Sequence, residues 1–177
     1  MKTKWKLHYF ISIMMIPVLL FASVKIVKTP HAEDIKQLFL EHQEEFKVLA
    51  FELMSICYRN AEDSSYWMLA KGRVVAEDAE YVGKIGSMDF YNIGQLIPQK
   101  EYENMYNIVS GHLDSLNLCG IGMDRGGIQF IISFSYYGSC RLFFVPFGGL
   151  LEINAPDGWV KEKIRICDGW YAVVTYD

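Results

Sequence analysis

The chain has 177 residues, of which 51% are hydrophobic, 15% aromatic and 21% charged. This length and composition indicate one globular domain with at most an appendage, and they exclude a disordered chain, a collagen-like chain and a long coiled coil. Residues 1–30 contain five lysines and no acid, whereas residues 31–177 contain 12 Lys/Arg and 21 Asp/Glu, a net charge of −9. The division predicts a basic apolar leader, residues 1–30, joined to an acidic domain, residues 31–177.

The leader contains an apolar run, residues 7–24, with no formal charge apart from His8. A helix that spans a bilayer needs about 20 apolar residues, and a cleaved secretory signal has a shorter apolar stretch followed by a small-residue cleavage site. The run therefore predicts a single-pass membrane anchor or, alternatively, a signal peptide whose removal leaves a secreted or periplasmic protein. The larger lysine cluster before the run favours a cytoplasmic N-terminus with the domain outside.

The first part of the domain carries two helical patterns. Apolar residues recur at helical spacing from residue 35 to residue 54, with glutamates largely between them, which predicts one amphipathic helix of about 20–24 residues ending near residues 57–60. Glycines interrupt the apolar runs of residues 61–95, where we expect loops with one or two short strands, at residues 66–70 and 73–76. A second amphipathic helix is predicted from Pro98 to residue 116.

The rest of the chain is rich in β-branched and aromatic residues, which favour strands. We expect strands at residues 117–123, 128–135, 140–145, 163–167 and 170–176. Turns are expected at residues 124–127 and 137–139 and at Asp168-Gly169, and a loop at residues 146–158. The predicted fold class is α+β: an N-terminal membrane helix or signal, then two amphipathic helices packed on an antiparallel β-meander.

The order of these elements resembles a loose group of small exported bacterial proteins of unassigned function. The residues that carry the resemblance are 39–46, 113–123, 130–135 and Gly169-Trp170-Tyr171. The chain departs from the group after Val145, where a Phe-Gly-Gly-Leu-Leu segment replaces a more polar stretch. The resemblance implies export and an α+β fold with a last strand that contains Gly-Trp-Tyr, and it implies no catalytic residue.

The four cysteines all lie in the domain, at Cys57, Cys119, Cys140 and Cys167. An even number in an exported domain allows two disulfides with three connectivities. The alternative is four buried thiols, because a cysteine that is not oxidised packs as a small hydrophobic side chain. No two cysteines have the spacing of a zinc knuckle, so no zinc site is expected.

Other polar residues give no recognisable site. His42 and Glu45 share a helix face, which fits either two metal ligands or a solvated surface, and the surrounding charges favour the surface. Ser110, His112 and Asp114 cannot form a triad within one helix, because residues two apart point in different directions. Neither a dinucleotide fingerprint nor a phosphate loop occurs. The sequence therefore predicts no catalytic residue, no cofactor and no metal.

The loop after residue 145 contains four large apolar residues, Phe147, Leu150, Leu151 and Trp159. They form either an exposed patch that contacts a partner, or a loop that folds back over the sheet. The acidic domain disfavours nucleic acid as a partner. We expect a membrane-anchored or exported interaction module, accessory or immunity-type, whose protein partner the sequence does not identify. The alternatives are a small-ligand or envelope-stress sensor domain and an enzyme of unrecognised type.

Overall fold

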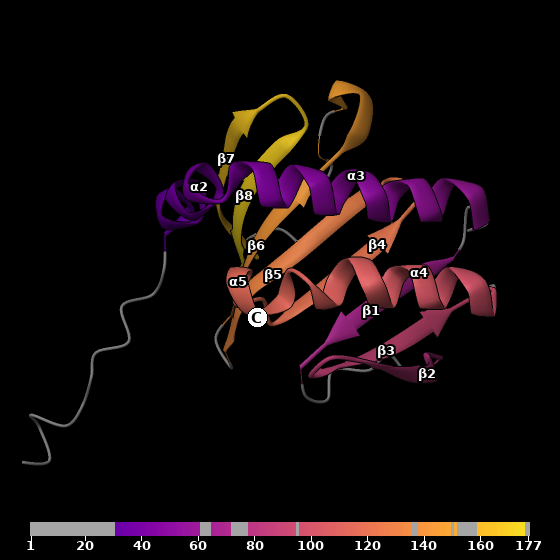
Figure 1. Ribbon diagram of the computed structural model, residues 1–177. Helices are drawn as coiled ribbons and strands as arrows, with labels where there is room; N and C mark the ends of the chain where they lie inside the picture. Colours follow the sequence, from indigo (N-terminus) through magenta and orange to yellow (C-terminus); the bar gives the residue numbers. More distant parts are fainter. Residues whose placement is uncertain are drawn as a thin grey trace, which may run out of the picture.

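The computed structural model describes residues 31–60, 65–71, 78–94, 96–135, 138–149, 151 and 159–175. These residues form an α+β fold in which the helices lie on one face of an eight-stranded antiparallel sheet (Figure 1). The predicted fold class is confirmed at this level. No described helix has the length and apolarity needed to cross a membrane. The predicted anchor, residues 7–24, lies outside the described residues.

The first predicted helix is two helices, α2 (Ala32–Glu41) and α3 (Gln43–Asn60). The prediction of one continuous helix was therefore wrong at His42, whose backbone has φ −116° and ψ 27°. The helical spacing of apolar residues continues past His42 without interruption, so the sequence pattern could not reveal the break. The break lets α2 pack on β6, β7 and β8 while α3 packs on β4 and β5 and against α4.

Residues 65–116 contain more strand than the sequence predicted. The strand at residues 66–70 is confirmed, the candidate at residues 73–76 lies outside the described residues, and two further strands replace the expected loop. The second helix ends earlier than predicted, at Ser110, and a single-turn helix follows it after Gly111. The elements are β1 (Tyr66–Ala70), β2 (Glu80–Ile85), β3 (Met88–Ile93), α4 (Gln99–Ser110) and α5 (Leu113–Leu116).

The C-terminal strands lie close to their predicted positions. Asp124 pairs with Gly127 and Cys167 pairs with Trp170, so the predicted turns at residues 124–127 and 168–169 are two-residue hairpin turns. The third predicted turn, at residues 137–139, was placed too late in the chain, because Gly138 and Ser139 already belong to a strand. A short 3-10 helix, η1 (Pro146–Gly148), begins the predicted loop. The strands are β4 (Gly120–Asp124), β5 (Gly127–Ser135), β6 (Gly138–Phe144), β7 (Val160–Cys167) and β8 (Trp170–Thr175).

The sheet is not the simple meander that the sequence predicted. Its strand order is β2-β3-β1-β4-β5-β6-β8-β7. Strand β8 lies between β6 and β7, and β1 lies between β3 and β4, so two strands enter the sheet out of chain order. Hydrophobic alternation indicates which face of a strand is buried but not which strand is its neighbour, so this strand order could not be predicted from the sequence pattern.

The core lies between the helices and the sheet and is centred on aromatic rings. Phe39 and Phe46 extend from α2 and α3, and Phe130 and Trp170 extend from the sheet to meet them. The ring centroids of Phe39 and Trp170 are 4.6 Å apart, and those of Phe46 and Phe130 are 5.2 Å apart. We call the opposite face of the sheet, over which no described helix lies, the open face.

Candidate functional site

Helix α3 exposes an apolar stripe on the side away from the sheet. Val48, Phe51 and Tyr58 are all exposed, and Phe51 keeps 76% of its surface in solvent. Their spacing of three and seven residues places them on one helix face. Phe46, Leu49 and Leu53 fill the opposite face and are fully buried. We call Val48, Phe51 and Tyr58 the α3 stripe.

Phe147 extends this stripe from a different part of the chain. Its side chain is 92% exposed, and its ring centroid lies 6.0 Å from that of Tyr58. The backbone of Phe147 has φ 59° and ψ 26°, a left-handed conformation that a bulky residue rarely adopts. Residues held in such conformations cluster at functional sites, where the surrounding structure fixes them.

The backbone on both sides of Phe147 is firmly held. Val145 donates its N–H to the carbonyl of Gly169 at 2.7 Å, and Gly149 donates its N–H to the carbonyl of Pro146 at 3.2 Å. The Tyr171 hydroxyl donates to the Gly149 carbonyl at 3.0 Å. These hydrogen bonds tie the turn to the β7–β8 hairpin on both sides of Phe147, whose ring faces solvent.

A groove runs beside the α3 stripe, where α3 and α4 lie next to each other (Figure 1). Its volume is about 340 Å³. Phe51, Ile56 and Ile108 give it an apolar wall, and Arg59 and Asn104 are among the polar residues at its edge. Phe51 links the α3 stripe to the groove, whose wall it lines, and Tyr58 links the stripe to Phe147.

Of the other residues of the predicted contact loop, Trp159 lies away from Phe147. Trp159 is 47% exposed, and it precedes Val160, which pairs with Thr175 at the far end of β8. Phe147 lies near the opposite end of that strand, roughly 17 Å away at the rise of an extended chain. Leu151 is half-buried, and its carbonyl accepts a hydrogen bond from Lys163 at 2.5 Å. Leu150 lies outside the described residues.

No disulfide bond joins any two of the four cysteines in the structure. Burial raises the pKa of the Cys57 thiol to about 12, and it also raises the pKa of Cys140 and Cys167. Cys119 and Cys140 lie on either side of β5, so their backbones are about 10 Å apart, whereas a disulfide needs a Cα separation below about 7 Å. A thiol titration distinguishes the two alternatives that the sequence left open, disulfides and buried thiols.

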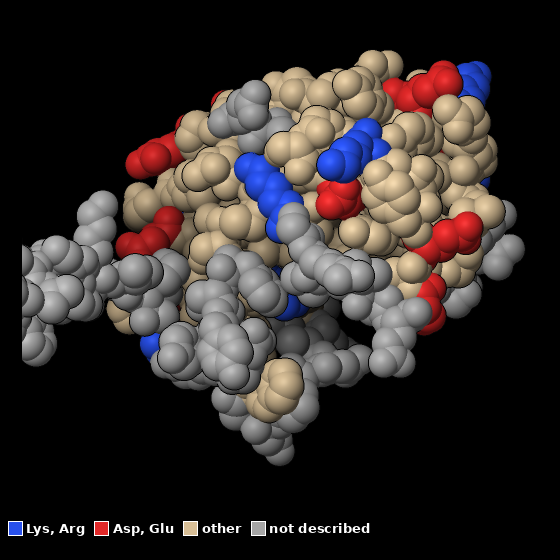
Figure 2. Space-filling model, turned by 90° about the horizontal axis from the view of Figure 1, so that it is seen from below, with Lys and Arg blue, Asp and Glu red and all other residues tan. Residues whose placement is uncertain are grey.

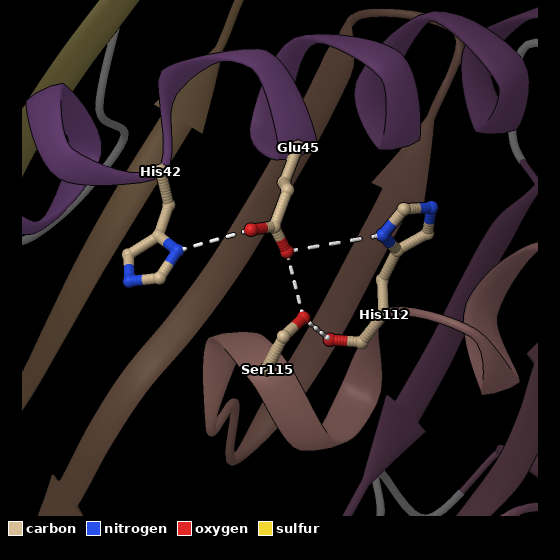
Figure 3. Close-up of polar contacts among 4 residues, drawn as sticks. All are labelled: His42, Glu45, His112 and Ser115. Atoms are coloured by element: carbon tan, nitrogen blue, oxygen red, sulfur yellow. Dashed lines mark hydrogen bonds and ion pairs between the residues drawn. The ribbon is translucent and has the colours of Figure 1, made fainter.

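The break between α2 and α3 brings together a polar cluster that the sequence did not reveal (Figure 3). Glu45 lies at its centre. One carboxylate oxygen is 3.2 Å from Nδ1 of His42, and the other accepts a hydrogen bond from the Ser115 hydroxyl at 2.7 Å. Nδ1 of His112 lies 4.0 Å from this second oxygen. The Ser115 hydrogen bond and the His42 contact lower the pKa of Glu45.

The geometry of this cluster does not suit nucleophilic catalysis. A catalytic triad needs a histidine between the serine and the carboxylate, so that the imidazole can accept the serine proton. Here the carboxylate lies between the serine and both histidines (Figure 3). The cluster thus joins α5 to the start of α3, and 67 residues separate Glu45 from His112 in the chain. No local sequence pattern could have linked them.

Two other predicted candidates find ordinary structural roles. The Ser110 hydroxyl donates to the carbonyl of Asn107 within α4 at 3.5 Å, and His42 and Glu45 lie on the surface. Within the described part of the chain, no group of three or more His, Cys, Asp or Glu residues is arranged to hold a metal ion.

Charge is dispersed over the face seen in Figure 2. Its described basic and acidic side chains lie among uncharged residues, singly or beside a charge of opposite sign. Lys84 of β2 and Asp89 of β3 form one ion pair of the described residues, with their charged atoms 3.7 Å apart. The described residues of this face therefore present no continuous basic surface of the kind that binds a phosphate backbone.

Comparisons with protein-family models, with curated proteins and with solved structures found no match.

Proposed function

We propose that this protein is a membrane-anchored or exported interaction module, accessory or immunity-type, that binds a partner protein through the α3 stripe and Phe147. The observation that carries the proposal is the exposed phenylalanine at position 147, held in a left-handed conformation beside Tyr58. Exposed aromatic side chains on a fixed backbone are typical anchors of protein interfaces. Residues 7–24 would hold the acidic domain at the membrane, on its outer side.

The energetics of the surface support a protein partner. Phe51 and Phe147 keep most of their apolar area in water in the isolated chain, and burying such area against a partner is favourable. Because the backbone around Phe147 is fixed by hydrogen bonds, little conformational entropy remains to be lost on binding. The polar residues at the edge of the groove supply the rim that surrounds such anchors.

Crosslinking in the native membrane tests the proposal. The full-length protein with a C-terminal tag is crosslinked and purified, and the co-purified proteins are identified by mass spectrometry. We expect one dominant partner, whose recovery falls in Phe51→Ser and in Phe147→Gly. Glycine accepts the left-handed conformation without strain, so Phe147→Gly should not lower the thermal unfolding midpoint.

The matched control is Tyr81→Ser, which removes an aromatic side chain that is 55% exposed on the edge strand β2. Recovery of the partner should not change in this variant. A partner that is recovered equally well with all three variants would contradict the proposed surface. The recovery of the tagged protein alone from its native membrane would contradict the interaction function itself.

A further inference from the structure

The open face of the sheet carries a chain of hydrogen bonds that crosses several strands. The Tyr66 hydroxyl on β1 meets the amide nitrogen of Gln129 on β5. The amide oxygen of Gln129 accepts a hydrogen bond from Nη1 of Arg141 on β6 at 3.1 Å. Nε of Arg141 donates to the Ser139 hydroxyl at 2.8 Å, and this hydroxyl is 2.9 Å from that of Thr175 on β8.

A glycine makes the first link of this chain possible. Strand β4 lies between β1 and β5, and its residue Gly122 pairs with both Met68 and Gln129. A Cβ atom at position 122 would collide with the Tyr66 hydroxyl and with the Gln129 amide. Because residue 122 has no side chain, the Tyr66 side chain can cross β4 and reach Gln129.

Two hollows flank the pair of Tyr66 and Gln129, which lines both of them. The smaller hollow, about 170 Å³, is lined mainly by apolar groups such as Met68 and Ile131, with Arg141 and Lys71 in its wall. The larger hollow, about 360 Å³, extends over the β4–β5 turn toward Val145. The two are therefore neighbouring hollows that share this polar pair in their walls.

The charges around the smaller hollow are unbalanced. Arg141 is half-buried, and its described hydrogen-bond partners are the neutral oxygens of Gln129 and Ser139. Among the residues that line the smaller hollow, Arg141 and Lys71 are cationic and none is acidic. Asp124, which lines the larger hollow, already accepts hydrogen bonds from the backbone N–H groups of Gly126 and Gly127, at 2.6 and 3.0 Å. A partly buried cation without an anion is unfavourable unless something supplies the negative charge.

We propose that the smaller hollow binds a small carboxylate with an apolar body. The guanidinium of Arg141 donates to the carboxylate, because its planar N–H groups match carboxylate oxygens. Lys71, exposed at the rim, adds a second positive charge, and Met68 and Ile131 contact the apolar body. Tyr66 and Gln129 hold Arg141 in place, so they are positioning residues. This site lies on the face opposite to the α3 stripe and does not depend on the proposed partner.

The test uses the full-length chain in nanodiscs of zwitterionic lipid, with para-fluorobenzoate as the probe and fluorine NMR as the readout. Para-fluorobenzamide has the same shape without the charge and is the matched neutral probe, and empty nanodiscs correct for partition into lipid. We expect saturable binding of the benzoate and binding of the benzamide that is about tenfold weaker or more, because a hydrogen bond to a charged group contributes that much.

Three variants locate the site. Arg141→Gln should weaken benzoate binding about tenfold or more, whereas Arg165→Gln, which removes a cation from β7 on the same sheet, should leave it unchanged. Met68→Trp fills the hollow without altering the polar chain, so it should abolish binding even if Arg141→Gln does not fold. Equal binding of the two probes, no binding of the benzoate, or undiminished binding to Met68→Trp would each overturn the proposal.

Discussion

Gly169, in the turn of the last hairpin, is required both by its local backbone conformation and by a tertiary contact. The sequence Asp168-Gly169 predicts a tight turn, and Gly169 indeed has φ +74°. The structure adds that a Cβ atom at this position would collide with the carbonyl oxygen of Val145. Gly169 is therefore required both by its conformation and by the approach of the segment that carries Phe147.

We predict that Gly169→Ala lowers the free energy of unfolding by about 2 kcal/mol or more, because a left-handed conformation and a backbone collision add together. Gly111→Ala is the matched control. Gly111 has φ −71° and ordinary space around its Cβ position, so alanine there should stabilise the protein by about 0.4–1 kcal/mol. Urea denaturation of both variants measures the difference, and equal effects would contradict this account.

The carboxylate of Glu162 in β7 caps the N-terminus of α2. Its carboxylate accepts the backbone N–H of Ala32 and a hydrogen bond from Nδ1 of His31, both at 2.8 Å. The Ala32 N–H, followed by His31, lowers the pKa of Glu162 below its ordinary value of 4.5. This cap could not be predicted from a local sequence pattern, because its donor and acceptor are 130 residues apart.

The lowered pKa of Glu162 predicts a pH dependence of stability. A carboxyl group whose pKa is lower in the folded state stabilises the protein above its unfolded pKa, and this contribution is lost as the pH falls through the folded pKa. Glu162→Gln should therefore lower the urea midpoint at neutral pH and lose less stability than the native chain below about pH 4.5. The exposed Glu41 of α2 provides the control, Glu41→Gln, which should keep the native pH profile. A Glu162→Gln profile parallel to that of the native chain would disprove the link.

At the scale of an element, α3 has two apolar faces with different roles. The buried face packs on the sheet through Phe46, whose ring meets those of Phe39, Phe130 and Trp170. The opposite face exposes Phe51. Because helical periodicity marks apolar positions without saying what covers them, the sequence predicted the buried face and missed the α3 stripe.

We predict that the same substitution on the two faces of α3 has different consequences. Phe46→Ala should lower the free energy of unfolding by about 3–5 kcal/mol, since it leaves a cavity in the aromatic core. Phe51→Ala should change it by less than about 0.5 kcal/mol, as expected for an exposed position. Thermal and chemical unfolding of the two variants measures this contrast. A large destabilisation by Phe51→Ala would indicate that the stripe is structural and not a contact surface.

At the scale of the whole molecule, the sheet order decides which distant segments meet. Strand β8 enters between β6 and β7, which places Trp170 in the core and the exposed Cys167 at a sheet edge. Cys57 lies on the buried face of α3 and is fully buried. The same topology therefore gives the four thiols unequal access to solvent.

Thiol titration with a disulfide reagent tests both this arrangement and the predicted disulfides. In the native protein Cys167 should react first, and Cys57 should react only as the protein unfolds, since burial protects it and raises its pKa to about 12. The early phase should disappear in Cys167→Ser. In denaturant without reductant we expect all four thiols to react, whereas two or none would show that disulfides form.

The sequence by itself determined the features that depend on neighbouring residues. The apolar pattern of residues 35–54, the Pro98 helix start and the Asp168-Gly169 turn are local, because backbone conformation and hydrophobic periodicity act over a few residues. They were enough to predict an α+β protein with an antiparallel sheet. The membrane anchor was also predicted from such a local pattern, and its residues, 7–24, lie outside the described part of the chain.

Only the tertiary structure decided which of these elements meet. The insertion of β8 beside β6, the Glu45 cluster, and the contact of Phe147 with Tyr58 each join residues far apart in the chain. Such contacts depend on how whole faces of helices and sheets pack together. The pattern of apolar residues along the chain is compatible with many such arrangements, each of which buries the same residues. The two surfaces proposed to bind ligands, the α3 stripe with Phe147 and the hollow beside Arg141, both arise at this level.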